Sequence, residues 1–170
     1  DVRTLAVIGT NLFAGTYSNG GVFLSTNNGA GWSAVNTGLT AKQILALAVS
    51  PASGGSGTNL FAGTYGGGVF LSTNNGTSWS AVNTGLTSSI VRVLAVSPAS
   101  GGSGTNIFAG TQGGGVFLST NNGTNWSAVG LTNMWVNALA FKGANFFAGT
   151  YGSGVFLSTN NGTSWTAAST

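Results

Sequence analysis

Few side chains in this sequence could carry out acid–base, nucleophilic or metal chemistry. The chain has no His, Cys or Glu, and Asp1 is its single acidic residue. General acid–base catalysis needs a titratable group near the working pH, and ordinary glycoside hydrolysis needs two carboxyl groups. Zinc and transition-metal sites need imidazole, thiolate or clustered carboxylate ligands. The sequence therefore predicts no catalytic residue, no metal site and no cofactor.

The side chains that remain for binding a ligand are aromatic, amide and guanidinium groups at positions expected on loops. The candidate ligand-binding residues are Trp135, Tyr17, Tyr65, Tyr151, Gln112, Arg3 and Arg92, with Gln43 and Asn137 beside them. Trp135 stands where equivalent segments carry Gln43 and Ile90. A Trp that departs from a repeat on a loop face can stack on a sugar ring or anchor a partner. The alternative is that Trp135 fills a central channel or packs on Met134.

An internal repeat that covers the whole chain has to position these candidates. The segment Ser-Thr-Asn-Asn-Gly-x-x-Trp occurs at 25–32, 72–79, 119–126 and 158–165. Each copy follows Gly-Val-Phe-Leu, which in turn follows Phe-Ala-Gly-Thr. The second and third repeats carry an extra Ser-Pro-Ala-Ser-Gly-Gly-Ser-Gly segment, at 50–57 and 97–104. Because the flanks of this insertion are unchanged, it is predicted to be a surface loop.

Each repeat contains four short β-type runs separated by turn signals. In the second repeat these runs are Leu45–Val49, Leu60–Thr64, Val69–Thr73 and Trp79–Val82. Asn75-Gly76, ahead of the last run, is the strongest short hairpin signal. The middle runs are apolar on both alternating faces, which indicates sheets that are covered on both sides. The predicted fold is all-β, a β-propeller of four four-stranded antiparallel blades, and the alternative is a β-solenoid.

The repeated motif Ser-x-Asn-x-Gly-x-x-Trp resembles the Asp-box, or BNR, motif (Ser-x-Asp-x-Gly-x-x-Trp) of sialidase-type and related bacterial propellers. The wider pattern resembles repeats in large secreted bacterial proteins. The resemblance implies a turn between the third and fourth strands, away from the ligand-binding face. Asn replaces the motif Asp here and can still accept backbone N–H bonds, so the Asn is expected to hold the hairpin while the Trp packs over it in the core. The structural Asp-box residues are Asn27, Trp32, Asn74, Trp79, Asn121, Trp126, Asn160 and Trp165.

The chain is predicted to be one repeat domain with blades at 1–37, 38–85, 86–130 and 131–170, or part of a longer repeat array. Its first residue is Asp rather than Met, which indicates a processed, trimmed or excerpted sequence. Each predicted blade begins at an inner strand and ends at an outer one, so no strand is shared across the termini. The array could close as a four-bladed ring, pair with a second copy, or continue in a longer chain.

Composition and the family resemblance together favour a non-catalytic scaffold, secreted or at the cell surface, that self-assembles into a homo-oligomer, filament or array. Only 3% of the residues are charged, so little like-charge repulsion keeps copies apart. The alternative is a carbohydrate-binding or adhesion module whose loop-face aromatics bind a glycan. The least favoured class is a sialidase-type enzyme fragment, which would need an arginine cluster and acidic partners. Four scattered cations predict no nucleic-acid partner, and the apolar runs are too short for membrane insertion.

Overall fold

The structure is a computed structural model that describes residues 1–51, 58–98 and 105–169. The first sheet contains β1 (Val2–Ile8), β2 (Asn11–Thr16), β3 (Gly21–Ser25) and β4 (Ser33–Ala34). The second contains β5 (Ile44–Pro51), β6 (Thr58–Thr64), β7 (Val69–Ser72) and β8 (Ser80–Ala81). The third contains β9 (Val91–Pro98), β10 (Thr105–Thr111), β11 (Val116–Ser119) and β12 (Ser127–Gly130). The fourth contains β13 (Val136–Lys142), β14 (Asn145–Thr150), β15 (Gly154–Ser158) and β16 (Thr166–Ser169).

Each sheet is a meander in which consecutive strands pair antiparallel. This confirms the prediction of four four-stranded antiparallel units, and the β-solenoid alternative is wrong because solenoid coils stack their strands in parallel. The predicted insertion loops at 50–57 and 97–104 fall mostly on residues outside those that the structure describes.

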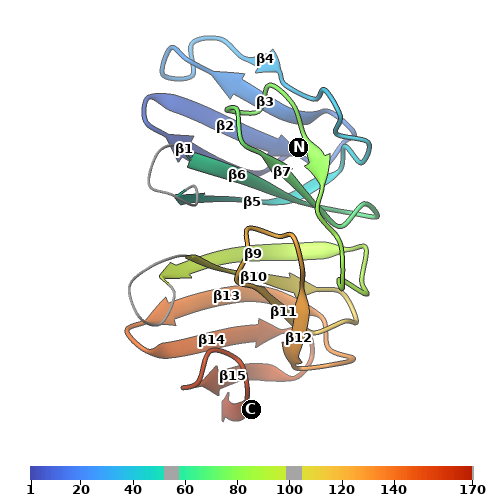
Figure 1. The fold of residues 1–170 in the computed structure, drawn as a ribbon, viewed down its shortest axis with the longest axis vertical. Helices are drawn as coiled ribbons and strands as arrows, with labels where there is room; N and C mark the ends of the chain where they lie inside the picture. Colours follow the sequence, from blue (N-terminus) through green and yellow to red (C-terminus); the bar gives the residue numbers. More distant parts are fainter. Residues whose placement is uncertain (52–57, 99–104, 170) are drawn as a thin grey trace.

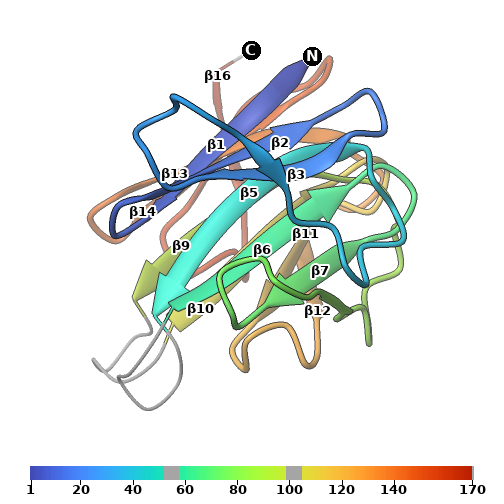
Figure 2. The same cartoon turned by 90° about the horizontal axis from the view of Figure 1, so that it is seen from above.

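The four sheets follow one another along the longest axis of the molecule, from the N-terminal sheet at one end to the C-terminal sheet at the other (Figure 1). Their first strands pack in series: β1 lies against β5, β5 against β9, and β9 against β13. The view down that axis shows the sheets overlapping (Figure 2). The sheets therefore form an array in which each one contacts its neighbours in sequence.

The Asn-Gly pairs form the tight turns that the sequence indicates. Asn75 and Gly76 both have left-handed backbone angles, with φ of 55° and 80°. They occupy the two central positions of a β-turn in which the Thr77 N–H donates to the Asn74 carbonyl at 3.2 Å, and Asn and Gly are the residues that adopt positive φ at least cost. This turn lies within a longer connection, because β7 ends at Ser72 and β8 begins at Ser80. Gly76 also lies against Phe13 and Val35 of the preceding sheet, where a larger side chain would have to displace them.

The fourth strand of the second sheet is shorter than predicted. The sequence indicated Trp79–Val82 in the second repeat, whereas β8 covers Ser80–Ala81. The Trp79 backbone N–H donates instead to the Thr37 carbonyl of the preceding sheet, at 2.9 Å. A backbone group that would otherwise extend the fourth strand thus makes a hydrogen bond to the segment that follows the preceding sheet.

Three apolar layers fill the gaps between consecutive sheets. We call the face of a sheet that points to the next sheet in sequence its trailing face, and the opposite face its leading face. In the middle gap, Phe61 and Val69 on the trailing face of the second sheet pack with Val91, Ile107 and Phe117 on the leading face of the third. All five side chains are buried. Each layer is therefore made by one trailing face and one leading face.

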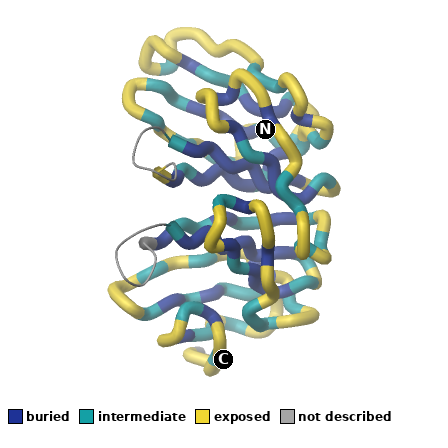
Figure 3. The backbone as a smooth tube through the Cα atoms, viewed as in Figure 1, coloured by how far each residue is buried: buried dark blue, intermediate teal, exposed yellow. Residues whose placement is uncertain are grey.

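The leading face of the first sheet has no sheet to cover it among the described residues. Val2, Leu5 and Val7 are 57%, 67% and 56% exposed, whereas Ile44 and Leu47, at the positions of Val2 and Leu5 in the second sheet, are 0% and 9% exposed. Buried residues concentrate in the two middle sheets (Figure 3). The first and fourth sheets do not pack face to face in the described part of the chain, so the array is open.

Trp32 corrects one expectation from the sequence. All four motif Trp residues were expected in the core. Trp79 and Trp126 are each 4% exposed, but Trp165 is only partly buried and Trp32 is 42% exposed. The reason is that the motif Trp packs on the preceding sheet, and the first sheet has no predecessor here.

This difference gives a test of where the stability lies. Trp126→Ala should lower the free energy of unfolding by about 3–5 kcal/mol, the usual cost of truncating a large buried aromatic residue. Trp32→Ala is the matched control and should cost much less, because the ring is partly in water already. Both values come from denaturant unfolding at the lowest protein concentration that gives a signal. Equal losses would show that another surface covers Trp32.

Candidate functional site

The Ser-Thr-Asn-Asn-Gly motif forms the turn between the third and fourth strands of every sheet. In the second sheet, Ser72 Oγ accepts the Gly76 N–H at 2.8 Å and donates to Asn74 Oδ1 at 2.9 Å. Asn74 Oδ1 also accepts the Ser78 N–H at 2.9 Å. The corresponding bonds occur around Asn27, Asn121 and Asn160. These side chains are occupied in closing the turn and are not presented to a ligand.

The motif Trp ties each turn to the sheet before it. Trp79 Nε1–H donates to the Val35 carbonyl at 2.8 Å, and Trp126 Nε1–H donates to the Val82 carbonyl at 2.7 Å. Trp165 makes the equivalent bond to Val129, at 3.0 Å. The sequence suggested a ring that packs over its own hairpin, and the structure adds a hydrogen bond from this ring to the preceding sheet. A hydrogen bond that is specific to one carbonyl fixes the register between consecutive sheets.

The turns between second and third strands lie at the opposite end of the sheets and, with the connections between sheets, make what we call the loop face. One repeat position supplies a side chain there from every sheet, and these residues are Tyr17, Tyr65, Gln112 and Tyr151. Their backbone N–H groups donate, at 2.9–3.0 Å, to the carbonyls of Asp1, Gln43, Ile90 and Trp135 respectively. Each acceptor immediately precedes the first strand of its sheet, so this bond holds the loop-face residue beside the start of that strand.

The structure brings five of the predicted residues together between the third and fourth sheets. Arg92 Nε donates to Asn137 Oδ1 at 2.6 Å, and Arg92 Nη1 donates to Gln112 Oε1 at 2.9 Å. The guanidinium carbon of Arg92 lies 5.8 Å from the centre of the Trp135 ring. The Trp135 and Tyr151 rings lie 5.5 Å apart with 31° between their planes. We call these five residues the Arg92 cluster.

A second group of predicted residues meets between the first and second sheets. The Arg3 guanidinium carbon lies 5.0 Å from the centre of the Tyr17 ring, and Arg3 Nε lies 3.1 Å from Asp1 Oδ2. The Tyr17 and Tyr65 rings make an edge contact with centres 6.4 Å apart. The Asp1 carboxylate therefore occupies part of the Arg3 guanidinium, whereas the Arg92 cluster contains no acidic group.

A pocket of about 240 Å³ contacts residues of both groups, and we call it the axial pocket because the first strand of every sheet, β1, β5, β9 and β13, contributes to its lining. Its lining is Arg3, Leu45, Arg92 and Asn137, one residue from each sheet at the same repeat position. Sequence reasoning named three of these residues and missed Leu45. Aligning the repeats places Leu45 with Arg3 and Arg92, so its position could have been found from the sequence. It was missed because an apolar side chain offers no hydrogen bond or charge to a ligand.

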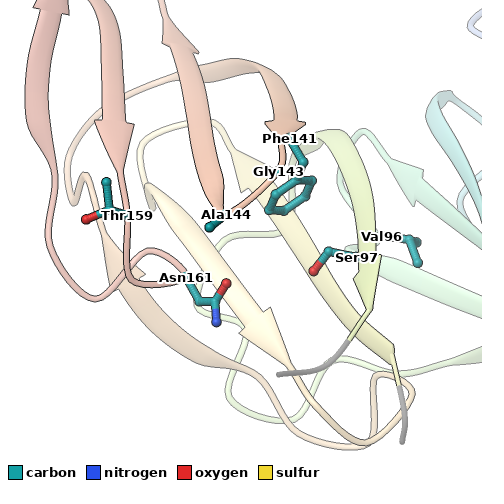
Figure 4. Close-up of a pocket in the computed structure, with 7 residues that line it drawn as sticks. All are labelled: Val96, Ser97, Phe141, Gly143, Ala144, Thr159 and Asn161. Carbon is teal, nitrogen blue, oxygen red and sulfur yellow. The ribbon is translucent and has the colours of Figure 1, made fainter. Parts of the chain in front are cut away.

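A larger pocket, of about 380 Å³, lies at the opposite end of the sheets (Figure 4). Its lining residues are Val96, Ser97, Phe141, Gly143, Ala144, Thr159 and Asn161. None of these carries an ionisable side chain, so the pocket offers shape and hydroxyl or amide groups but no acid–base chemistry.

The described residues contain no group of His, Cys, Asp and Glu that could hold a metal ion. They also contain no helix long and apolar enough to cross a lipid bilayer. The chemistry of the loop face is thus that of aromatic rings, amides and two guanidinium groups.

Comparison with known proteins bears on the fold. No protein-family model matches the chain, and no curated protein matches it. Among solved structures, an ancestral GH74 enzyme is 26% identical, with a TM-score of 0.76 over 98% of this chain and 24% of that one. The extracellular domain of BT4673 from B. thetaiotaomicron is 19% identical, with a TM-score of 0.75 over 98% of this chain and 22% of that one.

The fold is a β-propeller. Each of the four sheets is one blade. The chain spans about a quarter of the length of the GH74 enzyme and of the BT4673 domain. It is also similar to the computationally designed Ika4 protein, with 14% identity and a TM-score of 0.65 over 94% of this chain and 91% of that one.

The role of the Asn side chain in the turn can be tested by removing its acceptor oxygen or by replacing the amide with a carboxylate. Asn121 Oδ1 accepts the Asn125 N–H at 2.9 Å and the Ser119 hydroxyl at 3.0 Å. Asn121→Ala loses both bonds and should cost about 1–3 kcal/mol. Asn121→Asp keeps an acceptor at that position and should melt at or above the temperature of the unchanged protein. Thermal unfolding followed by circular dichroism measures both, and an Asp variant as unstable as the Ala variant would contradict the acceptor role.

Proposed function

We propose that this chain is a non-catalytic extracellular scaffold module that self-assembles by joining the first blade of one copy to the last blade of another. The observation that carries the proposal is the leading face of the first blade. Its Val2, Leu5 and Val7 side chains are exposed, although the same repeat positions are covered by a preceding blade elsewhere in the array. Contiguous apolar patches of this kind mark interaction surfaces on soluble proteins.

The last blade offers the matching surface. Val155 on its trailing face is 36% exposed, whereas the equivalent residues Val22, Val69 and Val116 are all 0% exposed. Phe147 is half-buried at a position where the other three blades bury Phe completely. A trailing face meets a leading face in all three internal layers. The two terminal faces of separate copies are therefore complementary by repetition of an interface that already exists.

The motif Trp gives this contact a defined register. In blades two to four the indole N–H donates to the carbonyl of the residue three positions after the preceding blade's motif Trp, as Trp79 does to Val35. The corresponding carbonyl of the last blade belongs to Ala168. In the proposed assembly, Trp32 of one copy donates to Ala168 of the next.

Charge does not oppose this association. The chain has four cations and one acidic residue in 170 residues, so repulsion between copies is small. A contact between two different faces leads either to a closed ring or to an open filament. Two copies joined at both pairs of faces give a ring of eight blades, four from each.

Other parts of the proposal have their own support. Matched structures include extracellular domains of bacterial proteins, which favours an extracellular location. The absence of Glu and His, with a single Asp at position 1, favours a non-catalytic role. We also propose that Ser-x-Asn-x-Gly-x-x-Trp is an uncharged form of the Asp-box, because its Ser and Asn close the turn by side-chain hydrogen bonds.

Self-assembly can be measured by light scattering after size exclusion over a hundredfold range of concentration. We expect a mass of two or more chains, little affected by salt because few charges take part. Leu5→Glu places a charge on the leading face of the first blade and should shift the protein to monomer. Thr77→Glu is the matched control, since it adds the same charge on an exposed turn outside both terminal faces, and it should leave the mass unchanged.

Two results would overturn self-assembly. One is a monomer of the unchanged protein at every concentration. The other is an assembly that Leu5→Glu and Thr77→Glu affect equally, because the contact would then lie elsewhere on the molecule.

The non-catalytic role is tested separately. Incubation with a broad panel of sialosides and aryl glycosides should release no product above a boiled control, because the chain lacks the paired carboxyl groups that this chemistry uses. A hydrolysis rate that persists through independent preparations would show that the chain is an enzyme.

A further inference from the structure

The four repeats are so alike that the places where they differ are informative. Gln112 replaces the Tyr of the other three blades, and Trp135 replaces Asp1, Gln43 and Ile90. These two departures, far apart in the sequence, are joined by an isolated antiparallel bridge. Both also contact Arg92. Because these two differences meet in one place, they indicate a site that only this pair of blades carries.

Arg92 is held in place by its neighbours and still has bonding capacity. Asn137 and Gln112 each accept one hydrogen bond from the guanidinium, at 2.6 and 2.9 Å. A guanidinium has five N–H donors, so three remain after these two bonds. No acidic residue pairs with this cation, because the sole Asp is bonded to Arg3. A fixed guanidinium with unused donors is suited to binding a carboxylate through two bonds.

Two aromatic rings lie beside this cation and face solvent. Trp135 is 42% exposed and Tyr151 is 71% exposed, and their rings are inclined by only 31°. An apolar surface of this kind, with a polar edge on Tyr, is suited to the flat face of a sugar ring. The neighbouring axial pocket of about 240 Å³ adds Arg3 as a second guanidinium.

We propose that the Arg92 cluster binds a carboxylated saccharide, such as a uronic acid oligomer. A sugar ring stacks on Trp135 and Tyr151, and its carboxylate pairs with Arg92 at the mouth of the axial pocket. Arg3 and Arg92 line this pocket and only Arg3 is paired with an acidic residue, so a net positive charge remains that favours an anionic ligand over a neutral one. The site goes beyond the scaffold role, since it lies on the loop face and uses neither terminal blade face.

The experiment is an isothermal titration calorimetry measurement in which the full chain is titrated with galacturonic acid trimer and, separately, with the neutral trimer of glucose. We expect the acidic trimer to bind with an affinity that falls as salt rises, and the neutral trimer to bind at least tenfold more weakly. Arg92→Leu introduces the residue found at the equivalent position 45 and should reduce binding of the acidic trimer at least tenfold. Lys142→Leu, which removes one positive charge outside the pocket, is the matched control and should bind as the unchanged protein does.

The aromatic half of the site is tested with Trp135→Ile and Tyr151→Ala. Position 90 already carries Ile at the equivalent of Trp135, and Tyr151 is mostly in water, so both variants should melt close to the unchanged protein while losing most of the affinity. Equal binding of the neutral trimer would overturn the carboxylate assignment. Equal losses from Arg92→Leu and Lys142→Leu would show attraction to net charge alone, and no binding of the acidic trimer would overturn the site.

Discussion

Each blade of this protein is apolar on both faces, and the rest of the structure depends on covering those faces. A four-stranded sheet with Phe and Val on one face and Leu, Ile and Trp on the other cannot be stable alone in water. The chain solves this by placing the trailing face of one blade on the leading face of the next, three times in succession. The indole bond from Trp79 to Val35, and its two equivalents, adds a directional contact to each apolar layer.

The same constraint explains the unusual composition. Strands that are buried on both sides leave few positions for charged residues, and the connections between third and fourth strands are built from Ser, Thr, Asn and Gly rather than from charged residues. Side-chain hydrogen bonds from Ser and Asn then satisfy the turn backbone without any charge, as Ser72 and Asn74 do. Among the described residues, no buried side-chain nitrogen or oxygen lacks a hydrogen-bond partner. A chain with 3% charged residues can therefore fold without leaving buried polar groups unpaired.

Much of this architecture could be predicted from the sequence, because the repeat shows the same strand and turn signals four times. The Asn75-Gly76 hairpin and the two-sided burial of Val69 and Phe70 follow from local pattern alone. The repeat could not predict which residues of the first and last blades are left exposed. Trp32 ends the same motif as Trp126, and its exposure depends on a neighbouring blade that no local pattern reports.

The loop face was predictable in part for a similar reason. Arg92, Gln112 and Trp135 stood out as candidates by type or by departure from the repeat, and they do meet. That Arg92 is held by two amides depends on Asn137, which comes from the next blade and lies 45 residues away. Leu45 was missed because its role comes only from its position around the axis.

The open ends of the array also affect how it comes apart. In a stack of repeats, the stability of each unit is the sum of its own folding free energy and that of its contacts with neighbours. The second and third blades have two such contacts and the first and fourth have one, so opening free energies rise from the ends toward the middle. Strand β6 lies in a blade that is covered on both faces, so exposing its amides requires the loss of two apolar layers. Strand β1 lies in a blade that is covered on one face, so exposing its amides requires the loss of one layer. In a single copy, unfolding therefore begins by fraying at the first and fourth blades, and the amide hydrogens of the two inner blades are the last to exchange with water.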